Sequence, residues 1–160
     1  MPPEPTELVA WRLTRAAHAD LSGRGGQLKT ARWTTQGRPV VYLSPEASLP
    51  VLEVLVNLDL PLEDMPADYV LMRVDLSPLV ADLGAAAIED ARHVATDPES
   101  ARPYEDRWLA EARTPCLRVA SHIVPEASNL LLNPIHKAAA LLDPATHRPF
   151  EFDPRLFTGD

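Results

Sequence analysis

A single carboxylate interrupts an apolar stretch in the first half of this sequence. Between Glu46 and Asp59 the chain reads Ala-Ser-Leu-Pro-Val-Leu-Glu-Val-Leu-Val-Asn-Leu, and Glu53 is its only ionisable residue. Because an unpaired buried charge is costly, this segment must lie at the edge of the core or beside a cleft. From the residues alone, Glu53 is either one half of a structural ion pair with an arginine or a functional acid.

The stretch around Glu53 has the signals of a helix. Ser44 is a suitable N-cap and Pro45 suits the first helical position, so we predict a helix of about three turns over residues 45–57. Pro50 lacks the backbone donor that a helix interior needs, which indicates a kink or a start one turn later. One stripe of this helix is formed by Leu52, Leu55 and Val56.

The remaining elements are short and do not alternate regularly between strand and helix. Residues 80–91 and 104–113 are typical of helices, and residues 138–142 of one helical turn. Strands are predicted at residues 8–13, 40–43, 69–76, 116–120, 129–134 and 150–153. This order favours an α+β fold with mixed or antiparallel sheets and flanking helices. We expect one domain over residues 1–160, with residues 1–7 as a loose tail.

Composition excludes several classes of protein. The net charge of −8 argues against direct binding of nucleic acid, and no apolar run reaches the length of a membrane span. The N-terminus is acidic and rich in proline, unlike a secretory signal, and the single cysteine excludes an internal disulfide. We therefore expect a cytoplasmic protein.

Positive charge is concentrated near the N-terminus. Residues 8–45 hold six bases and one acid, whereas the whole chain holds 15 bases and 23 acids. A local excess of this kind can bind a small anion such as phosphate. A solvated basic face is the alternative, because 13 of the 15 bases are arginines spread over the whole chain.

Two common kinds of catalytic site are disfavoured. No two of the five histidines have the i, i+4 spacing of a helical metal site, and Cys116, the only cysteine, lies in an apolar strand. We therefore expect no bound metal. The chain has no Gly-x-Ser-x-Gly motif, and Ser121 and His122 are adjacent, so on a strand they would point to opposite faces.

A third kind of chemistry fits the residue types better. Cleavage of a glycosidic bond in a phosphate-bearing substrate needs an arginine for phosphate, an aromatic ring for stacking and a carboxylate for an oxocarbenium-like centre. Arg32, Tyr42 and Glu53 supply these three types. The types are common, so by themselves they do not identify a reaction.

Segments along nearly the whole chain resemble the RES-domain family, the toxins of bacterial Xre–RES type II toxin–antitoxin pairs. They are Trp11-Arg12 with the Gly23–Gly26 loop, Arg32-Trp33 before Val40-Val41-Tyr42, residues 52–56, residues 117–121 leading to residues 129–136, and the closing residues 152–156. The resemblance implies an ADP-ribosyltransferase-like fold. It also implies an enzyme that cleaves the nicotinamide glycosidic bond of NAD by hydrolysis or phosphorolysis, with NAD as substrate and no separate cofactor.

The same resemblance assigns the site residues. The catalytic Arg, Glu and Ser fall on Arg32, Glu53 and Ser121, a site tyrosine on Tyr42, and further substrate or phosphate contacts on Asn133 and His136. The expected partner is a helix-turn-helix (Xre-like) antitoxin whose C-terminal region covers the site. A homodimer within that complex stays open.

Some questions remain open at the level of sequence. Ser128 is a rival for the site serine, and the positions flanking Arg32 depart from the family pattern, with Thr30-Ala31 before it and Thr34 after Trp33. Within the same family, the alternative activity is mono-ADP-ribosylation of a cellular protein. A non-enzymatic binding module of the same fold is the alternative from a different class.

Overall fold

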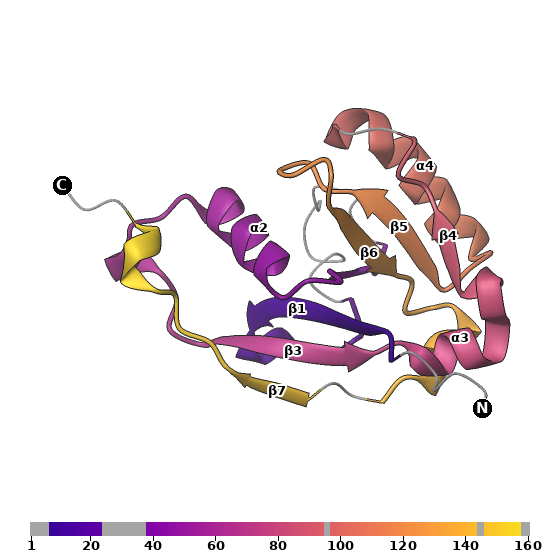
Figure 1. The fold of residues 1–160 in the computed structure, drawn as a ribbon, viewed down its shortest axis with the longest axis horizontal. Helices are drawn as coiled ribbons and strands as arrows, with labels where there is room; N and C mark the ends of the chain where they lie inside the picture. Colours follow the sequence, from indigo (N-terminus) through magenta and orange to yellow (C-terminus); the bar gives the residue numbers. More distant parts are fainter. Residues whose placement is uncertain (1–6, 24–37, 95–96, 144–145, 158–160) are drawn as a thin grey trace, which may run out of the picture.

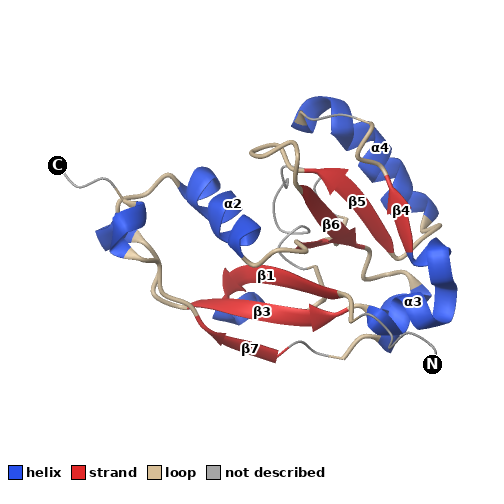
Figure 2. Cartoon of the chain, viewed as in Figure 1, coloured by secondary structure: helices blue, strands red, loops and turns tan. Residues whose placement is uncertain are grey.

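Two β-sheets form the centre of the molecule. The computed structural model describes residues 7–23, 38–94, 97–143 and 146–157. One sheet is antiparallel, with β1 (Val9–Arg15), β3 (Tyr69–Asp75) and β7 (Thr146–Pro149) in the order β1-β3-β7. The other contains β2 (Val41–Leu43), β4 (Ile88–Asp90), β5 (Cys116–Ala120) and β6 (Ser128–Leu132) in the order β2-β6-β5-β4 (Figures 1 and 2). Since only β4 and β5 pair in parallel in this sheet, the predicted mixed α+β class is confirmed.

Three α-helices lie beside these sheets within the described residues. They are α2 (Ser48–Leu58), α3 (Ser77–Leu83) and α4 (Pro98–Glu111). Short 3₁₀ turns occupy Ala16–His18, Leu62–Asp64, Gly84–Ala87, Lys137–Leu141 and Pro154–Leu156. Figure 1 shows α4 along the four-stranded sheet and α2 close to β1.

A pair of backbone hydrogen bonds joins the two sheets. The amide of Trp11 in β1 donates to the carbonyl of Ser44 at 2.7 Å, and the amide of Ser44 donates to the carbonyl of Trp11 at 2.8 Å. Ser44 directly follows β2, so this bridge fixes the end of β2 against the first strand of the other sheet. The prediction of Ser44 as an N-cap is therefore wrong, because α2 begins at Ser48 with Ala47 at its N-cap position.

The four-stranded sheet buries both of its faces. Leu43, Cys116 and Leu130 face a cluster that includes Leu79 of α3, and the burial of Cys116 raises the pKa of its thiol to about 12. On the opposite face, the side chains that pack together come from β5, from β6, from the residue before β2 and from α4 (Leu117, Val119, Leu131, Val40, Trp108 and Leu109). Trp108 and Leu109 are both buried and form the side of α4 that packs on the sheet.

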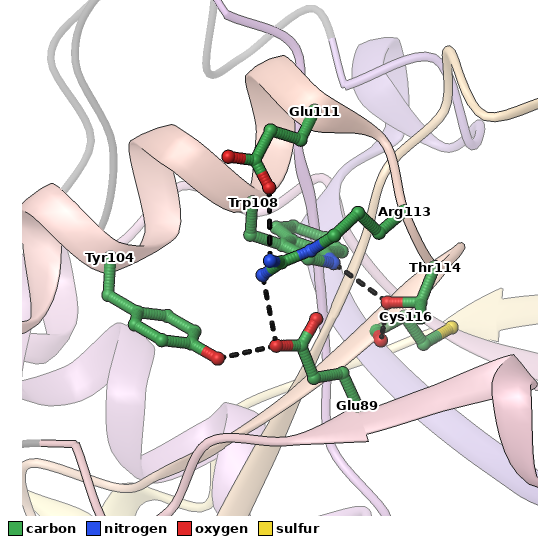
Figure 3. A network of polar contacts seen from close by, with 7 residues as sticks. All are labelled: Glu89, Tyr104, Trp108, Glu111, Arg113, Thr114 and Cys116. Atoms are coloured by element: carbon green, nitrogen blue, oxygen red, sulfur yellow. Dashed lines mark hydrogen bonds and ion pairs between the residues drawn. The ribbon is translucent and has the colours of Figure 1, made fainter.

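Polar contacts fix the C-terminal end of α4 to the sheet (Figure 3). Glu89 of β4 accepts hydrogen bonds from the Tyr104 hydroxyl and from Arg113, the latter at 3.2 Å. The indole of Trp108 donates to the Thr114 hydroxyl at 2.9 Å, and that hydroxyl donates to the carbonyl of Cys116 at 3.0 Å. The buried Trp108 ring thereby keeps its one polar atom paired.

Helix α2 differs from its predicted form in two respects. It starts about one turn later than residue 45, so that Pro50 is its third residue and lies in the first turn, where backbone N–H groups have no intrahelical acceptor. The predicted stripe is wrong, because Leu52 and Val56 are 39% and 57% exposed. The apolar side chains that pack toward β1 and β3 are instead Val51, Val54, Leu55 and Leu58.

Other boundaries shift for local reasons. Helix α4 starts at Pro98 rather than residue 104, because the Asp97 side chain caps it by accepting from the Ser100 amide at 2.9 Å. The helix predicted at 80–91 ends at Leu83, and Gly84, with a φ of 58°, precedes a turn and the unpredicted strand β4. The last strand is β7 rather than residues 150–153, whose Phe152 packs into the core by its ring.

One carboxyl group on α4 is buried without a hydrogen-bond partner among the described residues. Glu105 is 1% exposed, and neither carboxyl oxygen has a hydrogen-bond partner within the described part of the chain. Its neighbours around a small hollow are mainly apolar and include Ala91, Ala101 and Val119. Burial, together with repulsion from Asp106, raises the pKa of Glu105 to about 8.

Glu105 should make stability depend on pH. Its folded pKa lies above its unfolded value, so folding requires a bound proton, and unfolding free energy should fall as pH rises from about 5 towards 8. We expect Glu105→Gln to remove this component and to exceed the wild type in stability at pH 9 by a few kcal/mol. Urea unfolding at several pH values measures the difference.

The matched control for this prediction is Glu99→Gln, because Glu99 is an exposed residue on the same helix. It should leave the pH profile of the wild type unchanged. Parallel profiles for wild type and Glu105→Gln would contradict a proton bound at Glu105.

Candidate functional site

Glu53 meets two polar side chains from the four-stranded sheet. Its Oε1 atom accepts a hydrogen bond from Asn129 Nδ2 at 3.1 Å and lies 3.4 Å from the donating hydroxyl of Ser121. Glu53 is half-buried, whereas Asn129 and Ser121 are 4% and 0% exposed. Three elements distant in sequence, namely α2, β6 and the end of β5, therefore converge on one carboxylate.

Ser121 uses its hydroxyl fully. The Oγ atom accepts from the backbone amides of Ile123 and Val124 at 3.2 and 3.1 Å while it donates to Glu53. Its own amide donates to the carbonyl of Ala127 at 2.9 Å, which continues the pairing of β5 with β6. Because a hydroxyl offers one donor and two acceptor positions, this set of contacts fixes its orientation.

Asn129 is held from its other side by Ser44. The Ser44 hydroxyl donates to Asn129 Oδ1 at 2.6 Å, and both residues are buried. Neither Ser44 nor Asn129 was predicted from the sequence as part of the site. The available signal was the polar pair Ser128-Asn129 at the start of an otherwise apolar strand, whose interior positions rarely hold an amide without a partner.

Tyr42 lies on the same face of the sheet as this polar group. In β2 it pairs with Leu131, and β6 places Asn129 two residues away on that face. The ring packs beside the cluster around Trp108 and is half-buried. The structure thus brings Tyr42, Glu53 and Ser121 to one side of the four-stranded sheet, whereas Ser128 precedes Asn129 and points to the opposite face.

Asn133 and His136 are engaged in local backbone contacts. The buried Asn133 side chain donates to the carbonyl of Leu109 at 3.2 Å and accepts from the amide of Ile135 at 3.1 Å. His136 Nδ1 accepts from the amide of Ala138 at 3.1 Å and so caps the following turn. The bond from Asn133 to Leu109 joins the segment after β6 to α4, whereas the other two bonds shape the turn that follows. A role for either residue in substrate binding stays a prediction.

The Arg32 prediction lies outside the described residues, as do Thr30, Ala31 and Thr34. Of the glycine loop, Gly23 is described, and it has a φ of 72°. A Cβ atom at this position would lie 2.6 Å from the backbone nitrogen of Val40, so only glycine allows this close approach.

The described residues include no group of three or more His, Cys, Asp or Glu side chains arranged to hold a metal ion. None of their helices combines the length and apolar character needed to cross a bilayer. Arg12, a half-buried base of β1, donates to the carbonyls of His18 and Asp20 at 3.3 and 2.6 Å, and desolvation lowers its pKa.

Replacement of Ser121 tests whether its hydroxyl closes this turn. Ser121→Ala should lower the free energy of unfolding by about 1–3 kcal/mol, because two backbone amides lose their acceptor. Denaturant unfolding measures the loss. Ser128→Ala is the control on the paired strand and should cost clearly less, and equal losses would contradict the assigned contacts.

Comparison with known proteins places this chain in a family. Residues 9–153 match the protein-family model described as the RES domain. The chain is 36% identical over 132 residues to "Toxin Res" of Pseudomonas putida, covering 82% of this chain and 88% of that protein. It is 30% identical over 154 residues to the "Prs ADP-ribosylating toxin" of a Sphingobium species, covering 91% of this chain and 94% of that protein.

A solved structure shares the fold. The crystal structure of the M. tuberculosis MbcT–MbcA toxin–antitoxin complex contains a chain that superposes with a TM-score of 0.62 at 15% identity, covering 94% of this chain and 86% of that one. The two chains thus share the mixed α+β fold described above. The matched profile and the two relatives together show that this chain belongs to the RES-domain family.

Proposed function

We propose that this protein is the toxin of a bacterial type II toxin–antitoxin pair and that it consumes NAD by cleaving the nicotinamide glycosidic bond. The observation that carries the proposal is the Glu53 carboxylate, which is held by Asn129 and Ser121 on the sheet face that also bears Tyr42. Membership of the RES-domain family supports the toxin assignment, since the P. putida relative is named "Toxin Res".

The reaction needs little acid–base chemistry. When the bond between the ribose C1′ and the nicotinamide nitrogen breaks, its electron pair leaves with nicotinamide, which carries a positive charge in NAD and departs neutral. Positive charge then develops on the ribose ring, and a nearby carboxylate stabilises it. Water or phosphate forms the new bond at C1′ and loses a proton, so one carboxylate and no general acid suffices for the departure step.

The residues around Glu53 have distinct proposed roles. Glu53 binds the ribose hydroxyls and stabilises the oxocarbenium-like centre, and Tyr42 stacks on nicotinamide or its ribose. Ser121 orients the substrate or the carboxylate through its hydroxyl. Its contacts with two backbone amides and with Glu53 support a fixed orientation of this kind.

The phosphate end of the substrate is assigned to other residues. Arg32 would hold the pyrophosphate through forked, charged hydrogen bonds, a geometry for which guanidinium is well suited. Asn133 and His136 would support this end from the turn after β6. Their backbone contacts favour an indirect contribution, in which they position the turn rather than contact the substrate.

A cognate antitoxin would cover this site in the cytoplasm. The solved complex of the M. tuberculosis relative pairs a toxin with an antitoxin, and the resemblance implies an Xre-like helix-turn-helix partner. Leu52 and Val56, which flank Glu53 on α2, are the exposed apolar side chains that such a partner would bury.

Nicotinamide release tests the enzymatic proposal. Purified protein freed of antitoxin should release nicotinamide from NAD, measured by chromatography, with and without phosphate. Glu53→Gln should abolish release, because the neutral amide cannot stabilise the developing charge, and Arg32→Ala should reduce it by weakening pyrophosphate binding. Circular dichroism checks that the variants stay folded.

Two exposed positions supply controls. Glu46→Gln and Arg38→Ala change the same residue types outside the proposed site and should retain the wild-type rate. If wild type leaves NAD intact in water, in phosphate and with cell lysate, the enzymatic proposal fails. The non-enzymatic binding module would then be favoured, with Glu53 serving stability.

Mono-ADP-ribosylation is the second candidate, and the name of the Sphingobium relative favours it. The same oxocarbenium-like centre would be captured by a protein side chain instead of water or phosphate. NAD labelled in its adenylate half should then transfer label to a protein in lysate, in a Glu53-dependent manner. Complete recovery of the label as free ADP-ribose, or as its phosphorylated form, would exclude this alternative.

A further inference from the structure

We propose that Ser44 and Asn129 are positioning residues that orient the Glu53 carboxylate for catalysis. The assignment rests on the proposed function, because it concerns the acid of that reaction. The chain of contacts runs from the Ser44 hydroxyl to Asn129 Oδ1 at 2.6 Å, and from Asn129 Nδ2 to Glu53 Oε1 at 3.1 Å. One amide group therefore links the carboxylate to the core of the sheet.

Ser44, at one end of this series of hydrogen bonds, is held firmly by its backbone. The backbone of Ser44 is bound on both sides by Trp11, through the two hydrogen bonds that join the sheets. Ser44 itself is 3% exposed, and Asn129 is 4% exposed on a central strand that pairs on both sides. The position of the Asn129 amide is thus set by both sheets together rather than by a loop.

The direction of the amide follows from chemistry. A carboxylate only accepts hydrogen bonds, so the NH₂ group of Asn129 must face Glu53 and its carbonyl oxygen must face away. Ser44 meets that oxygen and donates to it, which leaves the amide one favourable orientation. Rotation of the amide by half a turn would place its oxygen against the carboxylate oxygen and lose the bond to Glu53, while the NH₂ group would turn to the Ser44 hydroxyl.

The location of Glu53, at the other end of these hydrogen bonds, explains why a positioning role is needed. Glu53 projects from α2, whose side chains pack on the three-stranded sheet, whereas its hydrogen-bond donors lie on the four-stranded sheet. A half-buried Glu side chain with three rotatable bonds could be hydrated in many rotamers. Binding to Asn129 selects one of them and fixes the distance between the acid and the face that bears Tyr42.

Turnover separates positioning from stability. Ser44→Ala should lower kcat about 10-fold and Asn129→Ala on the order of 100-fold, with KM changed less than about 2-fold, because the misplaced acid acts mainly in the transition state. Asn129→Asp has the same shape but presents an oxygen to Glu53, and it should lose at least as much kcat as Asn129→Ala. Ser128→Ala, on the opposite face of the same strand, should retain wild-type kcat.

The double variant sharpens this test. If Ser44 acts through Asn129, then Ser44→Ala should cost nothing further in an Asn129→Ala background. Additive losses, or a normal kcat for folded Ser44→Ala in an enzyme whose Glu53→Gln variant is inactive, would overturn the assignment. Ser44→Ala removes a single oxygen atom, so it carries the test if the Asn129 variants fail to fold.

A measurement without turnover keeps this proposal distinct from the proposed function. The side-chain amide resonances of Asn129 in ¹⁵N-labelled protein can be assigned by their absence in Asn129→Asp. Both Glu53→Gln and Ser44→Ala should shift these resonances, whereas Glu46→Gln should not. Unshifted resonances would overturn the positioning role of Ser44 and Asn129 even if NAD is cleaved. Shifted resonances in a protein that leaves NAD intact would reject only the proposed function.

Discussion

The bridge between Trp11 and Ser44 is the interaction on which the site depends. Its two backbone hydrogen bonds hold the two sheets together where β2 ends, and the Ser44 side chain continues from this point to Asn129. The helix that carries Glu53 packs on one sheet while its hydrogen-bond donors lie on the other. The distance between Glu53 and its donors therefore depends on how the two sheets are placed, and the bridge between Trp11 and Ser44 fixes that placement.

The face of the four-stranded sheet that meets Glu53 is divided along its strands. At one end, Leu117 and Leu131 pack against Trp108 of α4 in a closed apolar layer. At the other end, Ser44, Asn129 and Ser121 replace apolar residues, and the half-buried Glu53 lies over them. A buried polar group that lacks a hydrogen bond costs free energy, and these side chains avoid that cost by forming a connected network. The apolar end supplies the burial that keeps the network in place.

Glu53 and Ser121 were candidates from the sequence alone, but the residues that support Glu53 were not. Strands such as residues 69–76 and 116–120 were predictable because composition and alternation act locally, and Glu53 stood out as the lone acid of an apolar segment. The stripe of Leu52, Leu55 and Val56 did not reveal the packed side of α2, because residues 45–57 are apolar on nearly every side and no period distinguishes the packed side from the exposed one. Ser44 had a good local explanation as a helix cap, but its actual partner lies 85 residues away, and no local pattern encodes such a contact.

Two carboxyl groups close to the same sheet show how surroundings decide their use. Glu105 projects from α4 into mainly apolar surroundings, and burial raises its pKa to about 8. Its carboxyl group is therefore predominantly neutral near pH 7 and cannot stabilise a cation there. Glu53 has two uncharged donors directed at one oxygen and is only half-buried. Hydrogen bonds from an amide and a hydroxyl orient a carboxylate without adding a charge of their own. This kind of support suits the role proposed for Glu53, in which the carboxylate stabilises positive charge that develops on the ribose.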